Sequence, residues 1–339
     1  MAASNAITGF HFLQISVLFM IIYWSGFRAE AACDAKYQVI SRHSACLPKS
    51  PLASNSGVSS ADQSIIVNKH NEYRGQVTPE ATDMLKMSWD TYVAAVAQAW
   101  ADNCNYSHDS GYQRTIPGRY SAGQNLGKAT GQTPLTWDSV VTMWYNEVNN
   151  FVYNSSSNVF ANTGHYTQVV WAKSHKIGCG YAYCSTFHFY VCNYAPGGNG
   201  AGQVNTPYTS GPRCQSCGTC TNGLCDCGNA DCLNGGTFNL TTCSCTCRKQ
   251  SFYVQPRCGL NCTGITQTST CGKAPFDSAG CAIYSNVPED CPDTCGFCPA
   301  ADSTGDGKVV LPGAADDVKV KRTFLIGLLL LASSVQALF

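Results

Sequence analysis

The chain has 339 residues, with 21 basic and 21 acidic side chains and a formal net charge of zero at pH 7. Nucleic-acid binding needs a surplus of positive charge, so this balance argues against a nucleic-acid partner. The 22 cysteines are the strongest compositional signal. Sixteen of them lie between Cys214 and Cys298, which is typical of a disulfide framework formed in an oxidising compartment.

The N-terminus begins with a targeting pattern. The apolar run "FHFLQISVLFMIIYW" at residues 10–24 is short for a membrane span and is followed by the small-residue site Ala29-Glu30-Ala31. This arrangement predicts a secretory signal peptide over residues 1–31, followed by an irregular extension, rich in Ser, Ala and Pro, over residues 32–60.

Three helices and three strands are expected next. Helices are predicted within residues 61–77, over residues 91–104 behind Asp90 as N-cap, and within residues 136–151, where Glu147 lies at the edge of an apolar stripe. The runs "HYTQVVW", "KIGCGYAYC" and "FHFYVCNYA" are rich in aromatic and β-branched residues and predict strands. Helices flanking a small sheet predict an α-β-α sandwich.

The composition changes abruptly after "PGGNGAGQ". Short cysteine loops with few apolar residues cannot bury a core of their own, so we expect disulfides to hold this part of the chain. A flexible linker is predicted over residues 299–315.

The C-terminus is apolar to its last residue, "RTFLIGLLLLASSVQALF", behind a polar stretch and the small residues 313–315. This order predicts a glycosylphosphatidylinositol anchor signal over residues 316–339 that is removed, with a membrane-embedded helix as the alternative. In both cases the mature protein faces the outside of a membrane. Glycosylation sequons occur at Asn105, Asn154, Asn239 and Asn261.

Four motifs between residues 61 and 203, in chain order "HNEYR", "GQNL", "GHYTQVVWAKS" and "FYVCNYAPGGN", resemble the CAP superfamily of cysteine-rich secretory, antigen 5 and pathogenesis-related proteins. The resemblance implies the same α-β-α sandwich. It also implies disulfides joining Cys104 to Cys184 and Cys179 to Cys192. His70, Asn71 and Arg74 are then interpreted as structural residues of the first helix.

The downstream cysteines resemble three further modules. Residues 204–226, with Cys214, Cys217, Cys220 and Cys225, look like the hinge that follows CAP domains, and residues 227–258 resemble an EGF-like module. Residues 262–298 resemble a toxin-like ShK module. Its usual pairing would join Cys262 to Cys298, Cys271 to Cys291 and Cys281 to Cys295. All cysteines are then used, which leaves no thiol for nucleophilic catalysis.

The family resemblance also implies a cleft of two histidines and two acids. Carried over by motif, these are His108 of "CNYSH", Gln124 of "GQNL", Glu147 of "WYNEV" and His165 of "GHYTQ". Gln124 departs from the pattern, because it offers an amide where an acid is common. Two neutral imidazoles can bind Zn²⁺, with water and the Glu147 carboxylate in the remaining positions.

Several functions remain open from the sequence. A metal-dependent peptidase would use Glu147 as the base, but no His-Glu-x-x-His helix or nucleophile elbow is present, and we assign no catalytic residue. Relatives that bind sterols use an aromatic loop before "GHYTQ", which here carries Phe151, Tyr153 and Phe160; these aromatics could equally pack on the domain edge.

Ion-channel modulation through the ShK-like module is a further alternative. The segment "AIYSNVPED" contains Tyr284 but no lysine that could plug a cation pore. The sequence therefore favours a secreted or membrane-anchored glycoprotein, not an enzyme, that binds a lipid, a sterol or an extracellular protein, and defence, allergen-like or venom-like roles are all compatible with it.

Overall fold

The computed structural model describes residues 33–228, 230–248, 251–262, 265–284 and 286–298. The predicted signal peptide, the first residue of the predicted extension, the linker and the anchor signal lie outside these residues. Within the described part of the chain, no helix is both long and apolar enough to cross a membrane. The described residues from Asp34 onward belong to one compact unit.

A five-stranded sheet forms the centre of the first domain, in the order β1-β4-β5-β3, with β2 paired to β4. The long strands are β3 (Gly123–Thr130), β4 (Lys176–Cys184) and β5 (Phe187–Ala195), and they pair in antiparallel fashion. The short strands are β1 (Ala53–Ser54), which comes from the N-terminal extension, and β2 (Ser88–Trp89). Strands β4 and β5 lie where the sequence predicts them.

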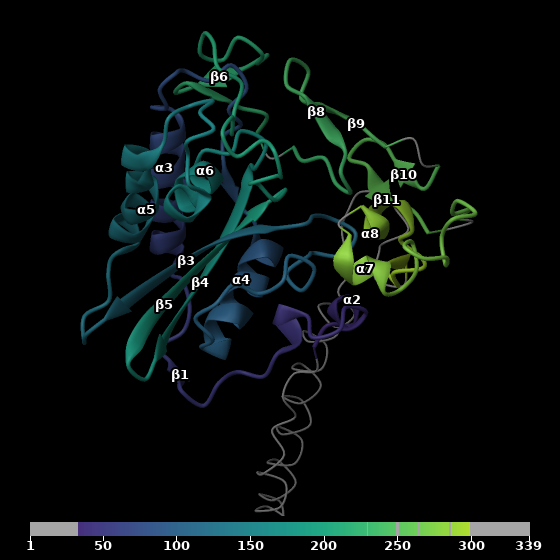
Figure 1. Cartoon of the computed structure of the whole chain (residues 1–339), viewed down its shortest axis with the longest axis horizontal. Helices are drawn as coiled ribbons and strands as arrows, with labels where there is room; N and C mark the ends of the chain where they lie inside the picture. The colour runs from purple at the N-terminus through teal and green to yellow at the C-terminus, as the bar shows by residue number, and fades with distance from the viewer. Residues whose placement is uncertain (1–32, 229, 249–250, 263–264, 285, 299–339) are drawn as a thin grey trace, which may run out of the picture. The chain divides into compact units, whose positions relative to one another are not determined.

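Helices cover both faces of this sheet (Figure 1). Helices α3 (Ser60–Arg74), α5 (Trp137–Tyr145) and α6 (Gly164–Val169) lie on one side, and α4 (Thr91–Asn103) lies on the other. Alternate residues of β5 serve the two cores: Tyr190 and Tyr194 face the larger cluster, while Phe189 and Val191 face α4. The predicted α-β-α sandwich is confirmed.

Helix α4 begins and packs as its sequence dictates. Asp90 accepts hydrogen bonds from the backbone N–H groups of Tyr92 and Val93, which caps the helix as predicted. Two glycines of β4 then let the helix lie directly on the sheet. A Cβ atom on Gly178 would be 2.0 Å from the Ala94 nitrogen, and one on Gly180 would be 2.3 Å from the Gln98 Cα.

The predicted strand "HYTQVVW" is wrong, because these residues form the helix α6 and its C-terminal turn. Tyr166, Thr167, Gln168 and Val169 are all buried, so four successive residues face the interior and no exposed polar face marks the helix. A short, fully buried helix and a buried strand cannot be separated by hydrophobic periodicity, and the aromatic and β-branched residues favoured the wrong choice.

Arg74, at the end of α3, holds the chain that follows α6. Its guanidinium is fully buried and donates to the carbonyl oxygens of Leu85, Val169, Trp171, Ala172 and Ser174. Burial lowers the pKa of Arg74 to about 9. The sequence interpretation of this arginine as structural agrees with these contacts.

Disulfides cross-link both regions of the chain. In the first domain Cys104 joins Cys184 and Cys179 joins Cys192. The hinge pairs Cys214 with Cys220 and Cys217 with Cys225. Residues 227–258 contain Cys227–Cys243, Cys232–Cys245 and Cys247–Cys258, and residues 262–298 contain Cys262–Cys298, Cys271–Cys291 and Cys281–Cys295. No cysteine of the described chain is free.

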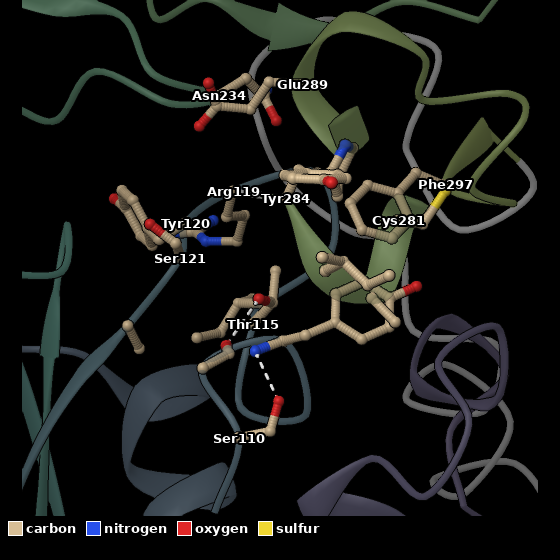
Figure 2. A pocket seen from close by; sticks show the side chains of 18 residues that line it. Ser110, Thr115, Arg119, Tyr120, Ser121, Asn234, Cys281, Tyr284, Glu289 and Phe297 are labelled. Atoms are coloured by element: carbon tan, nitrogen blue, oxygen red, sulfur yellow. Dashed lines mark hydrogen bonds between the residues drawn. The ribbon is translucent and has the colours of Figure 1, made fainter. Parts of the chain in front are cut away.

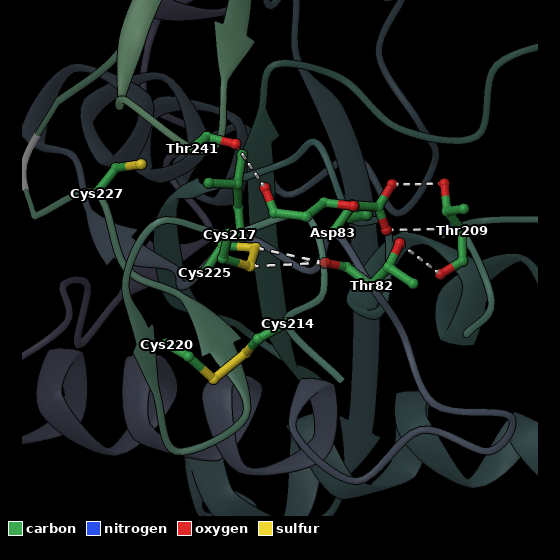
Figure 3. The surroundings of a disulfide bond; sticks show 12 residues. Thr82, Asp83, Thr209, Cys214, Cys217, Cys220, Cys225, Cys227 and Thr241 are labelled. Carbon is green, nitrogen blue, oxygen red and sulfur yellow. Dashed lines mark hydrogen bonds between the residues drawn. A yellow bond between two sulfur atoms is a disulfide. The ribbon is translucent and has the colours of Figure 1, made fainter. Parts of the chain in front are cut away.

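The hinge lies against residues 81–86 of the first domain (Figure 3). The backbone N–H groups of Cys214 and Ser216 donate to the carbonyls of Ala81 and Thr82, and the Cys225 N–H donates to Met84. The Cys217 sulfur is 3.6 Å from the Thr82 carbonyl oxygen. Its hairpin is β6 (Cys220–Thr221) with β7 (Leu224–Cys225). The disulfides of the hinge are therefore attached to the domain by backbone hydrogen bonds.

The remaining elements are short. The N-terminal extension contains α2 (Ala35–Gln38) and the 3-10 helix η1 (Ser44–Cys46). The last two modules contain β8 (Thr237–Asn239) with β9 (Ser244–Thr246), β10 (Tyr253–Val254) with β11 (Gly259–Leu260), and the helices α7 (Gly280–Ile283) and α8 (Val287–Asp290). A small apolar cluster that includes Phe252, Leu260 and Phe297 supports the disulfides there.

Candidate functional site

Glu147 positions both the backbone and the imidazole of His165 by hydrogen bonds. Glu147 lies in the 3-10 helix η2 (Asn146–Asn150), directly after α5. Its Oε2 accepts hydrogen bonds from the backbone N–H groups of His165 (2.8 Å) and Tyr166 (3.1 Å), and its Oε1 is 2.6 Å from Nδ1 of His165. The carboxylate thus caps the start of α6 and orients the imidazole.

The charge of Glu147 is stabilised in this position. Desolvation alone would raise its pKa, but the hydrogen bonds from the His165 ring and from the two backbone N–H groups outweigh that effect, and the net pKa of Glu147 lies below its ordinary value. Its side chain is 19% exposed. Glu147 therefore remains an acceptor for His165 at neutral pH.

The backbone of His165 is fixed from the other side. Asn125 Nδ2, on β3, donates to the His165 carbonyl oxygen (3.0 Å) and to the Tyr194 hydroxyl (3.2 Å). That hydroxyl is 2.9 Å from Nε2 of the fully buried His70. A buried network from α3 through β5 and β3 therefore positions His165, and His70 belongs to it.

His108 is held by an amide in place of a carboxylate. Its Nδ1 is 2.8 Å from Oε1 of Gln124, which lies on β3 and is 8% exposed. The amide nitrogen of Gln124 donates to Oδ1 of Asp109 (2.9 Å) and to Oδ1 of Asn193 (3.2 Å). Desolvation lowers the pKa of His108, which favours the neutral ring at neutral pH.

The two rings share an arrangement that suits a metal ion. Each Nδ1 faces an oxygen acceptor, so in its neutral form each ring carries its proton there and keeps the lone pair of Nε2. Among the residues that the structure describes, none hydrogen-bonds to either Nε2. His165 is also near enough to lower the pKa of His108 by its charge. Neutral imidazole nitrogens are ordinary zinc ligands.

In the part of the chain that the structure describes, the two imidazole nitrogens are the candidate ligands of this cleft. Within the described residues, no group of three or more His, Cys, Asp or Glu side chains could hold a metal ion. Gln124 and Glu147 lie behind the imidazoles as hydrogen-bond partners of Nδ1, which differs from the ligand role considered for Glu147 in the sequence. Water would have to complete the coordination of any ion bound here.

Two residues of the site, Asp109 and Asn125, are absent from the sequence prediction. Asp109 directly follows His108, and Asn125 directly follows Gln124. Adjacency to a candidate residue is a weak signal in sequence, because neighbouring side chains in an extended segment point to opposite faces. Only the pairing of β3 with β5 and the side-chain hydrogen bonds of Asp109 and Asn125 show that these side chains reach the site.

The predicted lipid-binding loop is divided between two environments. Phe151 packs on Tyr166, with ring centroids 5.0 Å apart, and the Tyr153 hydroxyl donates to the Tyr208 carbonyl oxygen at 2.6 Å. Phe160 is 52% exposed, and Val152 and Val159 are also more than half exposed. The structure therefore places two of the three aromatics on the domain edge and one at the surface.

A separate pocket of about 290 Å³ lies between residues 110–122 and the 262–298 module (Figure 2). Ile116, Tyr120, Ile283, Tyr284 and Phe297 provide much of its apolar lining. None of the four cleft residues lines it. The imidazole pair and this pocket are therefore distinct features of the molecule.

The central part of the chain matches a known family. Residues 67–194 match the family model described as "Cysteine-rich secretory protein family", abbreviated CAP. This segment is a CAP domain. It contains all four cleft residues, whereas the N-terminal extension and the 214–298 region lie outside the match.

Solved structures are similar to the CAP domain and its surroundings. The crystal structure of NaASP2 with Zn²⁺ has 26% identity over 51% of this chain and 99% of its own, with a TM-score of 0.45. Na-ASP-1 has 30% identity, and the match spans about half of each protein, 53% of this chain and 52% of its own, with a TM-score of 0.43. The venom allergen-like protein 4 of Schistosoma mansoni has 27% identity over 45% of this chain and 97% of its own, with a TM-score of 0.39.

Proposed function

We propose that this protein is an extracellular binding protein whose CAP domain takes a divalent transition-metal ion, zinc in the first instance, between His108 and His165. The observation that supports the proposal is the engagement of both Nδ1 atoms by oxygen acceptors, which leaves both Nε2 lone pairs for a ligand. A site of two imidazoles completed by water binds zinc more weakly than a closed four-residue site.

The test is a zinc titration of the secreted chain by calorimetry. We expect one zinc ion per chain for the parent protein and no detectable binding for the double variant His108→Ala and His165→Ala. His188→Gln is the matched control, because it removes an imidazole that contacts Tyr181 and Gly131 instead of the cleft. Equal binding by the double variant and the parent would refute the site.

The position of Glu147 supports a binding protein over a peptidase. A base that activates a metal-bound water must direct a carboxylate oxygen at that water, but three of the roughly four acceptor positions of Glu147 are already taken by His165 and Tyr166. Cleavage of a general peptide library that disappears in Glu147→Gln would reverse this preference.

Lipid or sterol binding is a second proposed function, and the exposed side chains of Val152, Val159 and Phe160 support it. Asn158 closes the loop between them by bonding to both the N–H and the carbonyl of Val152. Such an exposed apolar group on a fixed loop can enter a lipid phase. Protein partners would remain the alternative occupants of this surface.

The lipid test compares two exposed apolar residues. In a sterol-exchange assay, Phe160→Ser should reduce binding, while Leu52→Ser should leave it unchanged, because Leu52 is 57% exposed but belongs to the N-terminal extension. Phe151→Ala is less informative, since Phe151 packs on Tyr166 and its loss disturbs the domain edge. Equal exchange by Phe160→Ser and the parent would contradict lipid contact through this loop.

A membrane tether and glycosylation complete the proposal. The apolar C-terminal segment supports a glycosylphosphatidylinositol anchor, and phospholipase treatment of cells should release the protein. Retention after treatment would favour a membrane-embedded helix. Three of the four sequon residues, Asn105, Asn154 and Asn239, are exposed and accessible to a glycan. Glycosidase treatment should therefore reduce the mass of the secreted chain.

A further inference from the structure

An acidic side chain lies behind Gln124 on the His108 side of the cleft. Position 124 carries an amide, yet a carboxylate lies one hydrogen bond further away, on Asp109. The Asp109 side chain is fully buried, although the neighbouring His108 ring reaches the surface. The chain therefore keeps an acid on this side of the cleft, with Gln124 between it and the imidazole.

Asp109 decides how the Gln124 amide is oriented. A carboxylate only accepts hydrogen bonds, so the Gln124 side chain must present its NH₂ group to Asp109 and its carbonyl oxygen to His108. A carbonyl facing His108 in turn requires a proton on Nδ1. The opposite amide orientation would set oxygen against oxygen at Asp109 and would favour the tautomer that carries its proton on Nε2.

Asp109 is itself firmly held. Arg114 Nη1 donates to Oδ1 of Asp109 at 2.8 Å, and Arg114 Nε donates to the Ala122 carbonyl oxygen, one residue before β3. The hydroxyl of Ser44 donates to Oδ2 of Asp109. Ser44 is fully buried in η1 and lies outside the CAP match. The N-terminal extension thus contributes a side chain to the support of the cleft.

We propose that Asp109, held by Ser44 and Arg114, is a positioning residue that fixes the tautomer of His108 through Gln124, so that Nε2 is kept as the metal ligand. The role of Nε2 as a metal ligand rests on the proposed zinc site, but the tautomer of His108 is a property of the metal-free protein. It assigns a role in the site to a residue of the N-terminal extension and explains how an amide at position 124 is compatible with a ligand histidine.

The test reads the tautomer directly, by NMR of the full secreted chain with ¹⁵N-labelled histidine and no metal. Protonated and unprotonated ring nitrogens of a neutral imidazole give separate ¹⁵N signals. We expect His108 of the parent to carry its proton on Nδ1. Asp109→Asn is nearly isosteric but can accept or donate, so the Gln124 amide can reverse, and signal from the Nε2-protonated ring should appear.

The zinc affinity should follow the tautomer. Loss of the group that hydrogen-bonds a metal ligand typically weakens binding by about 10- to 100-fold, and because Asp109 acts through Gln124 we expect the lower end of that range, about 10-fold, for Asp109→Asn. Adding Gln124→Glu to that variant places a carboxylate directly against Nδ1 and should restore both the tautomer and the affinity. A residue needed only for folding would not be rescued in this way.

The outcomes separate the two proposals. If Asp109→Asn leaves the His108 tautomer unchanged, the positioning role is refuted, whatever the zinc affinity. If the tautomer changes but the parent binds no zinc, the positioning role stands and the proposed metal function fails. Should Asp109→Asn fail to fold, Ser44→Ala is the milder variant: it should yield a smaller but measurable fraction of the Nε2-protonated ring, and an unchanged spectrum would overturn the proposal.

Discussion

The CAP domain and the cysteine-rich region at residues 214–298 are stabilised by different means. The CAP domain buries large side chains on both sides of a sheet, Trp144 and Tyr190 on one side and Phe189 on the other, and it also buries polar groups that include Arg74 and His70. The cysteine-rich region contains eight disulfides and strands of two or three residues.

This difference predicts different weaknesses. A domain that depends on buried polar groups loses stability when their protonation or partners change, because the folded state cannot rehydrate them. A region that depends on disulfides loses stability when the unfolded chain regains its freedom. The two can be observed separately, since the described tryptophans all lie between residues 89 and 171 and the cysteine-rich region has neither tryptophan nor histidine.

Acidification should have the largest effect, and it should act on the CAP domain. Burial lowers the pKa of both His70 and His175 from 6.5 to about 4. Between these values the unfolded chain binds more protons than the folded one, so the free energy of unfolding falls as the pH falls from 6.5 to 4. Each histidine contributes up to about 3 kcal/mol of this loss, or about 6 kcal/mol together.

Urea unfolding followed by tryptophan fluorescence at several pH values measures this effect. Hydrogen exchange of residues 214–298 over the same pH range provides the internal control, and its protection should change much less once the intrinsic exchange rates are corrected for pH. A CAP-domain unfolding free energy that stays constant from pH 6.5 to 4 would contradict the burial of neutral histidines as a source of acid sensitivity.

Loss of the buried guanidinium should have the next largest effect. Arg74→Met preserves an apolar stem but removes the guanidinium donors to five carbonyl oxygens, of which only those of Trp171 and Ala172 also accept a backbone N–H that the structure shows. Unsatisfied buried acceptors are costly, and we expect the free energy of unfolding to fall by about 5 kcal/mol. Arg213→Met, at a guanidinium that is 40% exposed, should cost less than about 1 kcal/mol. Similar losses for the two variants would refute the proposed importance of Arg74.

The elements of the CAP domain differ in how far the sequence alone predicts them. Asp90 as N-cap, the strands β4 and β5 and the α-β-α arrangement follow from local spacing, because local patterns determine local structure. The helix α6 does not follow from it. Its short buried run depends on tertiary contacts, including the Arg74 hydrogen bonds to Val169 and to the residues after it.

The site divides in the same way. The family resemblance brings His108, Gln124, Glu147 and His165 together as candidates, and the structure arranges them as two hydrogen-bonded pairs. The roles within each pair depend on contacts that spacing does not reveal. Ser44 and Asp109 are 65 residues apart in the chain, and no periodicity connects them.

The smallest of these effects is expected from single disulfides, and it distinguishes the two regions most directly. Cys262–Cys298 closes a separation of 36 residues, and the loop-entropy relation gives about 4 kcal/mol for its removal as a paired Cys→Ser variant. Cys179–Cys192 links facing residues of β4 and β5, which many backbone hydrogen bonds and a buried core already hold in register. Its paired Cys→Ala variant should cost less, about 3 kcal/mol, and leave the CAP domain folded.

Hydrogen exchange should therefore show residues 262–298 unprotected in the Cys262–Cys298 variant and the sheet protected in the Cys179–Cys192 variant. The opposite result is an unprotected sheet without Cys179–Cys192 and protected residues 262–298 without Cys262–Cys298. It would contradict the view that the CAP domain depends on its packed core and the 262–298 module on its disulfides.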